Sequence, residues 1–302
     1  MLKYPALFAP INVGGVMLKN RIVMVPMAVN YAHLNGEVSE RQIAYYEARA
    51  RGGAGLIIVE AACIDAPAGR EGFGQILIDH PRYLRGLSQL ADGIKSCGSR
   101  ALIQLFHAGR QTHSIITGVQ PVAPSAVACA TVKDVPRELS ITEVQDIRDK
   151  FIAAAGYAYM AGFDGVEVHA AHGYLINQFL SPNCNLRQDE YGGSLDNRVR
   201  LLMEIVAGIK KGFPKLVLDV RLNIDDFVPG GLEMPESLEI CRRLDEAGVD
   251  LINCSCGTYE SGLTSIEPAS YTEGWRTYMA AAVKQVVKIP VISGGMIKKP
   301  EM

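Results

Sequence analysis

The sequence predicts an α/β fold, a TIM-type (β/α)₈ barrel, and three observations carry this prediction. Short runs rich in Val, Ile and Leu recur seven times without polar alternation, as in parallel strands that are buried on both faces. Helical patterns that end in Gly separate these runs, which is the order of βαβ units. The 302 residues show no linker and no change in composition, so 1–302 is expected to form a single barrel domain.

The first expected element is a small N-terminal hairpin in PINVGGVMLKNR (10–21), with its turn at Gly14-Gly15, which would close the bottom of the barrel. A doubly wound sheet is the alternative fold, but it needs a Gly-rich phosphate turn after its first strand, and the sequence has none there. The seven strands are expected at 21–26, 55–60, 100–105, 165–169, 216–222, 251–255 and 290–294.

Three helix starts can be recognised from capping residues. Ser39-x-x-Gln42 and Thr142-x-x-Gln145 have the spacing of capping boxes, in which a hydroxyl and an amide satisfy free N–H groups of the first turn. Ser194 is the expected N-cap of the helix LDNRVRLLMEIVAGIKKG (195–212).

A closed (β/α)₈ barrel has eight strands, and the sequence predicts seven. The residues after the seventh run, GGMIKKPEM, leave no room for another strand and helix. We therefore expect a barrel truncated before its eighth strand, with the eighth βα unit missing from the chain. Such a barrel would expose strand edges and an apolar face.

Composition excludes several classes of function. The formal net charge of −2, with Lys and Arg scattered, argues against a nucleic-acid partner or a polybasic membrane surface. No apolar run approaches the roughly 18 residues of a membrane span, and Pro and Gly interrupt the N-terminus where a signal peptide would be apolar. The seven Cys are scattered without a CxxC pair, which is typical of reduced thiols in a cytoplasmic protein.

The strongest candidate for chemistry is VEVHAAHGYLINQFL (166–180), because active sites of such barrels lie at the C-terminal ends of strands. His169 ends a strand, His172 follows three residues later, and Tyr174 can reach the same volume. Two neutral imidazoles could hold a carbonyl oxygen, and a Tyr hydroxyl could deliver a proton. The alternatives are a structural His pair or a metal pair, although the third ligand that a catalytic metal usually needs is not visible, so no metal site is expected.

Three further strand ends offer groups for a planar, anionic ligand. Arg221 ends LVLDVRL, where a cation needs an electron-rich partner such as a reduced flavin; an ion pair with Asp219 or Asp225 is the alternative. Gln104 offers a donor and an acceptor to a ring edge, or is simply a satisfied buried amide. Gly294-Gly295 leaves bare N–H groups where barrels often bind phosphate, or forms only a turn.

With these residues in place, the chain resembles the old yellow enzyme family of FMN-dependent oxidoreductases over essentially its whole length. The similarity is closest to the bacterial branch of 2-enoate reductase and 2,4-dienoyl-CoA reductase-like proteins. The matching segments are LFAPINVGGVMLKNRIVMVPM, GLIIVEA, IQLFHAGR, APSA (123–126), AGFDGVEVHAAHGYLINQFLSPNCNLRQDEYGGSLDNRVR and GVDLINCSCG.

The resemblance implies a role for each candidate residue. Gln104 would bind the pyrimidine edge of FMN and Arg221 its N1/O2 side. His169 and His172 would hold the carbonyl oxygen of the substrate, and Tyr174 would supply the α-proton. The residues expected to line the flavin are Pro26, Met27, Ala28 and Ala61, and those at its phosphate are Gly294 and Gly295.

Some positions depart from the family pattern. Ala28 stands where many relatives have Thr or Cys against the flavin, and Asn30 stands where several have Tyr. Phe106 would either narrow the pocket or serve packing alone. The Gly-Arg segment of the eighth strand is absent, and an iron–sulfur cluster is expected only if a longer natural chain exists. Six residues are interpreted as scaffold: Asn185, Arg187, Asp189, Tyr191, Asn197 and Arg198.

The sequence therefore predicts an ene-reductase that reduces the C=C bond of an α,β-unsaturated carbonyl, with hydride from NADH or NADPH passing through FMN. The expected partner is this small-molecule substrate, and the chain could form a homo-oligomer. Two alternatives stay open: an oxidative member of the family, acting by amine demethylation or ketone desaturation, and a non-catalytic truncated barrel fragment.

Overall fold

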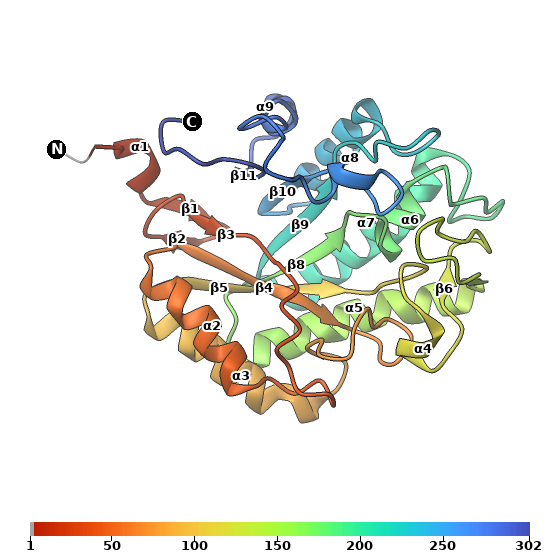
Figure 1. Cartoon of the computed structure of the whole chain (residues 1–302), viewed down its shortest axis with the longest axis horizontal. Coiled ribbons are helices and arrows are strands. Elements are labelled where there is room, and N and C mark those ends of the chain that lie inside the picture. Colours follow the sequence, from red (N-terminus) through yellow and green to blue (C-terminus); the bar gives the residue numbers. More distant parts are fainter. Residues whose placement is uncertain (1–2) are drawn as a thin grey trace.

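The computed structural model describes residues 3–302 and contains the predicted parallel sheet. Seven strands lie in the order β11-β10-β9-β8-β5-β4-β3, every neighbouring pair is parallel, and the sheet curls into an incomplete barrel (Figure 1). Each strand overlaps a predicted run, although the first and last are only two residues long. The strands are β3 (Val23–Met24), β4 (Leu56–Cys63), β5 (Arg100–Phe106), β8 (Gly165–Ala170), β9 (Val217–Asn223), β10 (Leu251–Ser255) and β11 (Val291–Ile292).

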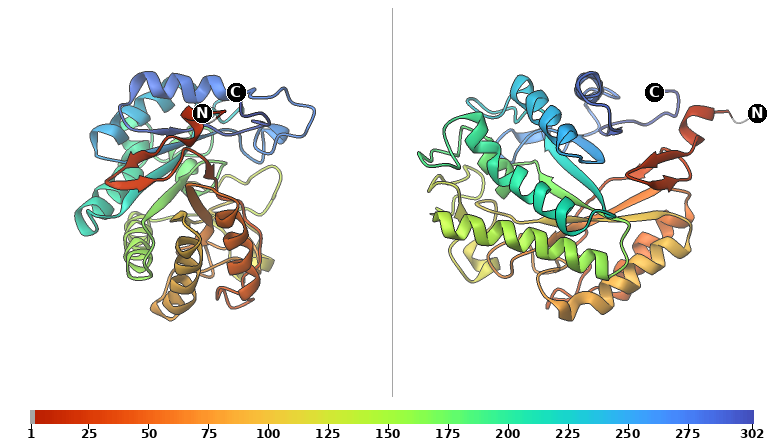
Figure 2. Two further views of the ribbon diagram at one scale, coloured as in Figure 1. Left: turned by 90° about the vertical axis from the view of Figure 1, so that its left-hand side faces the viewer. Right: turned by 180° about the vertical axis from the view of Figure 1, so that it is seen from behind.

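Helices cover the outer face of this sheet, as βαβ connections require (Figure 2). None of the helices from residue 3 onward combines the length and the apolar character needed to cross a bilayer. The main helices are α2 (Glu40–Arg51), α3 (Leu84–Ser96), α5 (Ile141–Met160), α7 (Leu195–Gly212), α8 (Met234–Glu246) and α9 (Thr277–Val286). The smaller elements are α1 (Pro5–Phe8), α4 (Ser114–Thr117), α6 (Leu175–Leu180), the 3₁₀ turns Pro81–Tyr83 and Gly262–Thr264, and the strand pair β6 (Val122–Ala123) and β7 (Arg137–Glu138).

The predicted N-terminal hairpin is present and packs against the bottom of the barrel. Its strands, β1 (Ile11–Val13) and β2 (Val16–Leu18), pair antiparallel. The turn between them has positive φ angles of 54° at Gly14 and 86° at Gly15, which glycine adopts without steric cost. Val13 and Leu18 of the hairpin join one buried cluster with Leu56, Ile58, Leu102, Val217, Leu251 and Ile292 of the barrel strands.

Two of the three predicted helix starts are correct and one is wrong. Ser39 caps α2 and accepts a hydrogen bond from the N–H of Gln42 at 3.1 Å, and Ser194 caps α7. The capping box predicted at Ser39 is only half formed, because the side-chain amide of Gln42 donates to Glu60 at 2.6 Å instead of satisfying the helix start. The capping box predicted at Thr142 lies two residues too late. Helix α5 begins after Ser140, whose hydroxyl accepts from the N–H of Glu143, while the Glu143 carboxylate accepts from the N–H of Ser140 at 2.8 Å.

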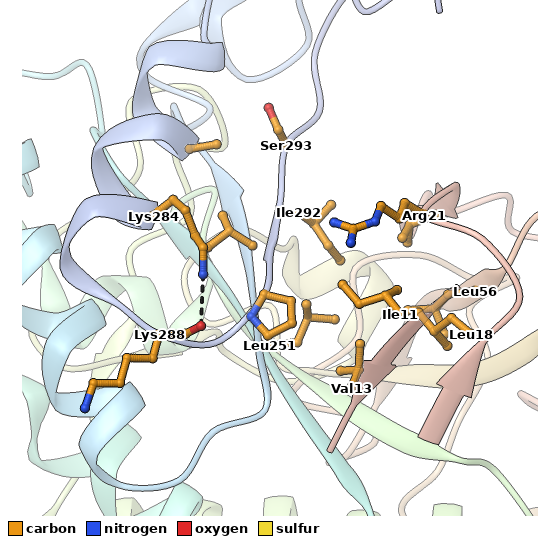
Figure 3. A pocket seen from close by; sticks show the side chains of 14 residues that line it. Ile11, Val13, Leu18, Arg21, Leu56, Leu251, Lys284, Lys288, Ile292 and Ser293 are labelled. Carbon is orange, nitrogen blue, oxygen red and sulfur yellow. Dashed lines mark hydrogen bonds between the residues drawn. The ribbon is translucent and has the colours of Figure 1, made fainter. Parts of the chain in front are cut away.

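A seam separates the first strand of the sheet from the last. Within residues 3–302 no strand joins β3 to β11, and the gap between them holds a cavity of about 460 Å³. Figure 3 shows Ile11, Leu251 and Ile292 pointing into this cavity from its two sides. Three basic side chains, of Arg21, Lys284 and Lys288, lie around the apolar lining.

Candidate active site

The structure brings the two predicted histidines and the tyrosine together at the C-terminal end of β8. The rings of His169 and His172 lie 5.1 Å apart, and those of His169 and Tyr174 lie 5.0 Å apart, both in edge-to-face contact. His169 belongs to the strand, whereas Tyr174 immediately precedes α6. The turn between strand and helix is what folds the three side chains onto one volume.

That turn depends on an uncommon backbone conformation at His172, which has a φ of 60°. Two side chains hold it there. The amide oxygen of Asn223 accepts from the His172 N–H at 3.1 Å, and the amide nitrogen of Gln111 donates to the His172 carbonyl at 2.8 Å. Because Asn223 ends β9 and Gln111 lies in the loop after β5, the position of this imidazole is set by the tertiary structure.

The surroundings of both imidazoles disfavour their charged form. Burial, reinforced by the positive charge of Arg221, lowers the pKa of His169 and of His172 well below the usual range. Nδ1 of His169 accepts from the N–H of Ala171 at 3.2 Å, so the ring proton is placed on Nε2. Nε2 of His172 lies 2.6 Å from the hydroxyl of Ser255, which fixes that ring in turn.

Tyr174 sits among groups that keep its phenol protonated. Burial raises its pKa well above 10.0, and the neighbouring carboxyl of Glu71 raises it further. The Tyr174 hydroxyl lies 2.9 Å from the hydroxyl of Tyr259, and the ring packs on Phe106 with centroids 4.5 Å apart. Phe106 is fully buried, so it supports the tyrosine. Sequence reasoning missed Glu71 and Tyr259, because both lie on loops without a periodic signal.

Arg221 extends from β9 and forms neither of the alternative ion pairs. Its Nη1 donates to the carbonyl of Pro26 at 3.1 Å, its buried Nε has no partner, and no carboxylate of residues 3–302 lies within 4.0 Å of the guanidinium. Burial and the adjacent Glu167 raise the pKa of Asp219 well above the usual carboxyl value. Arg221 therefore remains available to a ligand.

Gln104 is 2% exposed and lies inside the barrel. Its amide nitrogen donates to Oε1 of Glu167 at 2.6 Å, and Asn253 donates to the other carboxylate oxygen at 2.7 Å. Glu167 thus orients two amides from two other strands, β5 and β10, a role that the sequence did not reveal.

The remaining predicted flavin contacts lie around the same mouth. Pro26 is buried with its carbonyl on Arg221, Ala61 is buried in β4, and Met27 (51% exposed) and Ala28 are exposed. Gly294 and Gly295 follow β11, and neither N–H donates a hydrogen bond within the described chain. These two N–H groups are free to bind an anion.

The long run after Tyr174 is scaffold, as interpreted from the sequence. Arg187 donates to the carbonyls of Pro124 and Leu139 at 3.0 and 2.6 Å, and Arg198 donates to the carbonyl of Leu180. The side-chain amide of Asn185 donates to the carbonyls of Phe179 and Tyr191, which lie before and after it in the chain. These bonds tie the loop to its neighbours.

The cysteines are thiols, and the part of the chain that the structure describes holds no cluster of metal-ligating side chains. All seven cysteines are free, and burial raises the pKa of Cys184 and of Cys241 to about 12, which keeps both as thiols. Among residues 3–302, no three His, Cys, Asp or Glu side chains are grouped as metal ligands.

Comparison with known families identifies the family of the chain. Residues 6–302 match the model of the NADH:flavin oxidoreductase / NADH oxidase family. The chain belongs to this family. The NADH oxidase of Thermoanaerobacter brockii is 46% identical over 303 residues, covering 100% of this chain and 46% of the relative. The NADPH dehydrogenase of Bacillus cytotoxicus is 38% identical over 293 residues, covering 96% of this chain and 82% of the relative.

Solved structures of the family share the fold. A 2-naphthoyl-CoA reductase in complex with 2-naphthoyl-CoA superposes with a TM-score of 0.94 at 31% identity, covering 99% of this chain and 47% of that one. The old yellow enzyme homologue from Zymomonas mobilis superposes with a TM-score of 0.84 at 29% identity, covering 98% and 84%. The chain thus spans about half the length of some relatives, such as the 46% of the T. brockii oxidase, and most of the length of others.

Proposed function

We propose that this chain binds FMN across the barrel mouth and reduces the C=C bond of an α,β-unsaturated carbonyl with NADH or NADPH. The observation that carries the proposal is the convergence of two neutral imidazoles and a protonated phenol beside an unpaired cation. An enone requires this combination, because negative charge develops on its oxygen while its α-carbon takes up a proton.

The residues around the mouth fit FMN. The orphaned Nε of Arg221 suits the electron-rich N1/O2 side of a reduced flavin. The free N–H groups of Gly294 and Gly295 suit a phosphate, and Ala28 and Ala61 present small apolar surfaces to a ring. FMN bound there would supply the hydride chemistry, with NADH or NADPH as the reductant.

The side chains then provide orientation and the proton. His169, through Nε2–H, and His172 hold the carbonyl oxygen and stabilise the charge that forms on it. Tyr174 donates its phenolic proton to the α-carbon as the β-carbon receives the hydride, so the substrate gains two electrons and two hydrogens overall. The hydrogen bonds with Asn223 and Gln111 fix the backbone of His172, and so hold its imidazole where the carbonyl oxygen of the substrate would bind.

A phenolic ligand tests the histidine pair. In the FMN-loaded chain, 4-hydroxybenzaldehyde should bind with its oxygen on the two histidines and give a long-wavelength charge-transfer band. His172→Ala should abolish the band, whereas His33→Ala, at an exposed histidine, should leave it unchanged. A band of undiminished strength in the His172 variant would refute the assignment of the oxygen site.

The same preparation separates the alternatives. Bleaching by NADH or NADPH, with recolouring by an enone, supports reduction. Bleaching by an amine or a saturated ketone, without a nicotinamide, would favour the oxidative members of the family. A chain that takes up no FMN would favour the non-catalytic fragment.

A further inference from the structure

A buried carboxyl is linked to the turn of His172 and Gly173 (the histidine turn), although the reaction proposed above gives it no role. Asp226 stands in the loop after β9, three residues beyond the end of that strand, and it is fully buried. Four donors surround its two oxygens. A carboxyl group inside a protein is costly unless donors of this kind satisfy it, so Asp226 and its partners form one hydrogen-bonded unit.

Two of the four donors are asparagine amides, and both bind the same oxygen. Oδ1 of Asp226 accepts from Nδ2 of Asn223 at 2.7 Å and from Nδ2 of Asn177 at 3.2 Å. Asn223 ends β9 and Asn177 lies in α6, so the carboxyl joins these two elements. The other oxygen, Oδ2, accepts from the hydroxyl of Ser181 at 2.7 Å and from the N–H of Leu232 at 2.9 Å.

The carboxyl determines which way each amide faces. A carboxylate oxygen only accepts and an amide nitrogen only donates, so the nitrogen of each amide points at Asp226 and the amide oxygen points away from it. The oxygen of Asn223 accepts from the N–H of His172 at 3.1 Å. The oxygen of Asn177 accepts from the N–H of Gly173 at 2.6 Å. Both amides therefore connect the buried carboxyl to the histidine turn.

The two N–H groups held in this way belong to residues with uncommon backbone angles. His172 has a φ of 60° and Gly173 a φ of 78°, so both lie in the left-handed region. A residue with a side chain keeps this conformation only where the surrounding contacts impose it. Because the imidazole of His172 leaves the backbone at this point, the direction of the ring depends on the histidine turn.

We propose that Asp226 is a positioning residue for the proposed reaction: through the two asparagine amides it holds the histidine turn in the conformation that directs the His172 imidazole to the oxygen of the substrate. The inference rests on the proposed function, since that oxygen is the ligand of the same site. Asp226 acts through the amides and not on the substrate itself. Its loss should therefore weaken the binding of an oxygen ligand and leave the binding of flavin almost unchanged.

The charge-transfer band of 4-hydroxybenzaldehyde on the FMN-loaded chain measures the binding of an oxygen ligand. Asp226→Ala should weaken this binding about tenfold or more, the size of a lost hydrogen bond to a charged group, while the affinity for FMN changes by less than about twofold. Ser181→Ala is the matched control. It removes a partner of the same carboxyl, on the oxygen that neither amide binds, and should leave the affinity for the phenol unchanged.

Amide hydrogen exchange of the flavin-free chain tests the positioning without any ligand. In Asp226→Ala the N–H groups of His172 and Gly173 should lose their protection, because their acceptors are no longer held in place, and in Ser181→Ala they should keep it. A second variant, Asn223→Ala, removes the acceptor of His172 directly and replaces Asp226→Ala if that variant folds poorly. The double variant should weaken phenol binding no further than the more damaging single change, because both act on the same turn.

Several results would overturn the inference alone. They are phenol binding by Asp226→Ala as tight as in the wild type, equal losses of FMN and phenol affinity, and full additivity in the double variant. A wild-type chain that binds FMN but gives no band would instead overturn the proposed function. Loss of protection at the two N–H groups in Asp226→Ala would then still support the link between the carboxyl and the histidine turn, and retained protection would overturn it.

Discussion

His169 and Arg221 show which residues of the site a sequence can reveal. Each ends a buried apolar strand, and in a parallel barrel such ends meet at one mouth, so their convergence follows from the strand pattern alone. Glu71 and Tyr259 come from loops whose paths depend on tertiary contacts, and no periodic pattern in the sequence predicts them. The φ of 60° at His172 is of the same kind, because partners far along the chain hold it.

Glu71 provides a test of the electrostatics around Tyr174. Burial raises the pKa of Tyr174, and the charge of Glu71 raises it further, so Glu71→Gln should lower this pKa while leaving it above 10.0. Absorbance of tyrosinate near 295 nm, followed through an alkaline titration, measures the change. Subtracting the titration curve of the matching Tyr174→Phe variant from that of each protein leaves the titration of Tyr174 alone. If Tyr174 titrates identically in the wild type and in Glu71→Gln, the influence of Glu71 on Tyr174 is contradicted.

The start of α5 shows what decides between two similar capping patterns at the level of an element. Ser140-x-x-Glu143 and Thr142-x-x-Gln145 both have suitable spacing, but only the first gains an outside partner. Arg137 donates twice to Glu143, at 2.9 and 2.7 Å, and holds the pKa of that carboxyl at about 2. The seven strands and the hairpin could be predicted because the apolar runs and the Gly14-Gly15 turn are read directly from neighbouring residues in the sequence.

Removing each hydroxyl in turn tests the corrected boundary. Ser140→Ala should lower the free energy of unfolding by about 1 kcal/mol, because an N–H group of the first turn loses its acceptor. Thr142→Ala, two residues into the same helix region, serves as the matched control and should cost much less. Urea denaturation of both variants measures the difference. A larger loss in the Thr142 variant would restore the boundary expected from sequence.

At the scale of the whole molecule, the seam between β3 and β11 is the main departure from a closed barrel. Both edges are unpaired within residues 3–302, and the apolar cavity of about 460 Å³ lies between them. Tyr4 and Glu301 are joined by a hydrogen bond of 2.6 Å, so the two ends of the described chain lie beside each other. We propose that one further strand and helix would fill this seam.

Extending the chain tests that proposal. A version continued at its C-terminus with a strand and a helix designed to pair with β3 and β11 should melt at least about 5 °C higher, because apolar surface in the seam becomes buried. An otherwise equal extension with Pro at the centre of the strand is the control, since Pro cannot complete the strand pairing. Equal melting temperatures for all three chains would refute the proposal.

The most direct test of the account is the anaerobic reoxidation of the FMN-loaded chain by 2-cyclohexen-1-one after reduction with NADH or NADPH. The enone should restore the flavin colour in the wild-type chain. In Tyr174→Phe, this step should be about 10²–10⁴-fold slower, because the proton donor is lost, while reduction by the nicotinamide keeps its rate. A wild-type chain that the enone cannot reoxidise, or a Tyr174→Phe variant reoxidised as fast as the wild type, would contradict it.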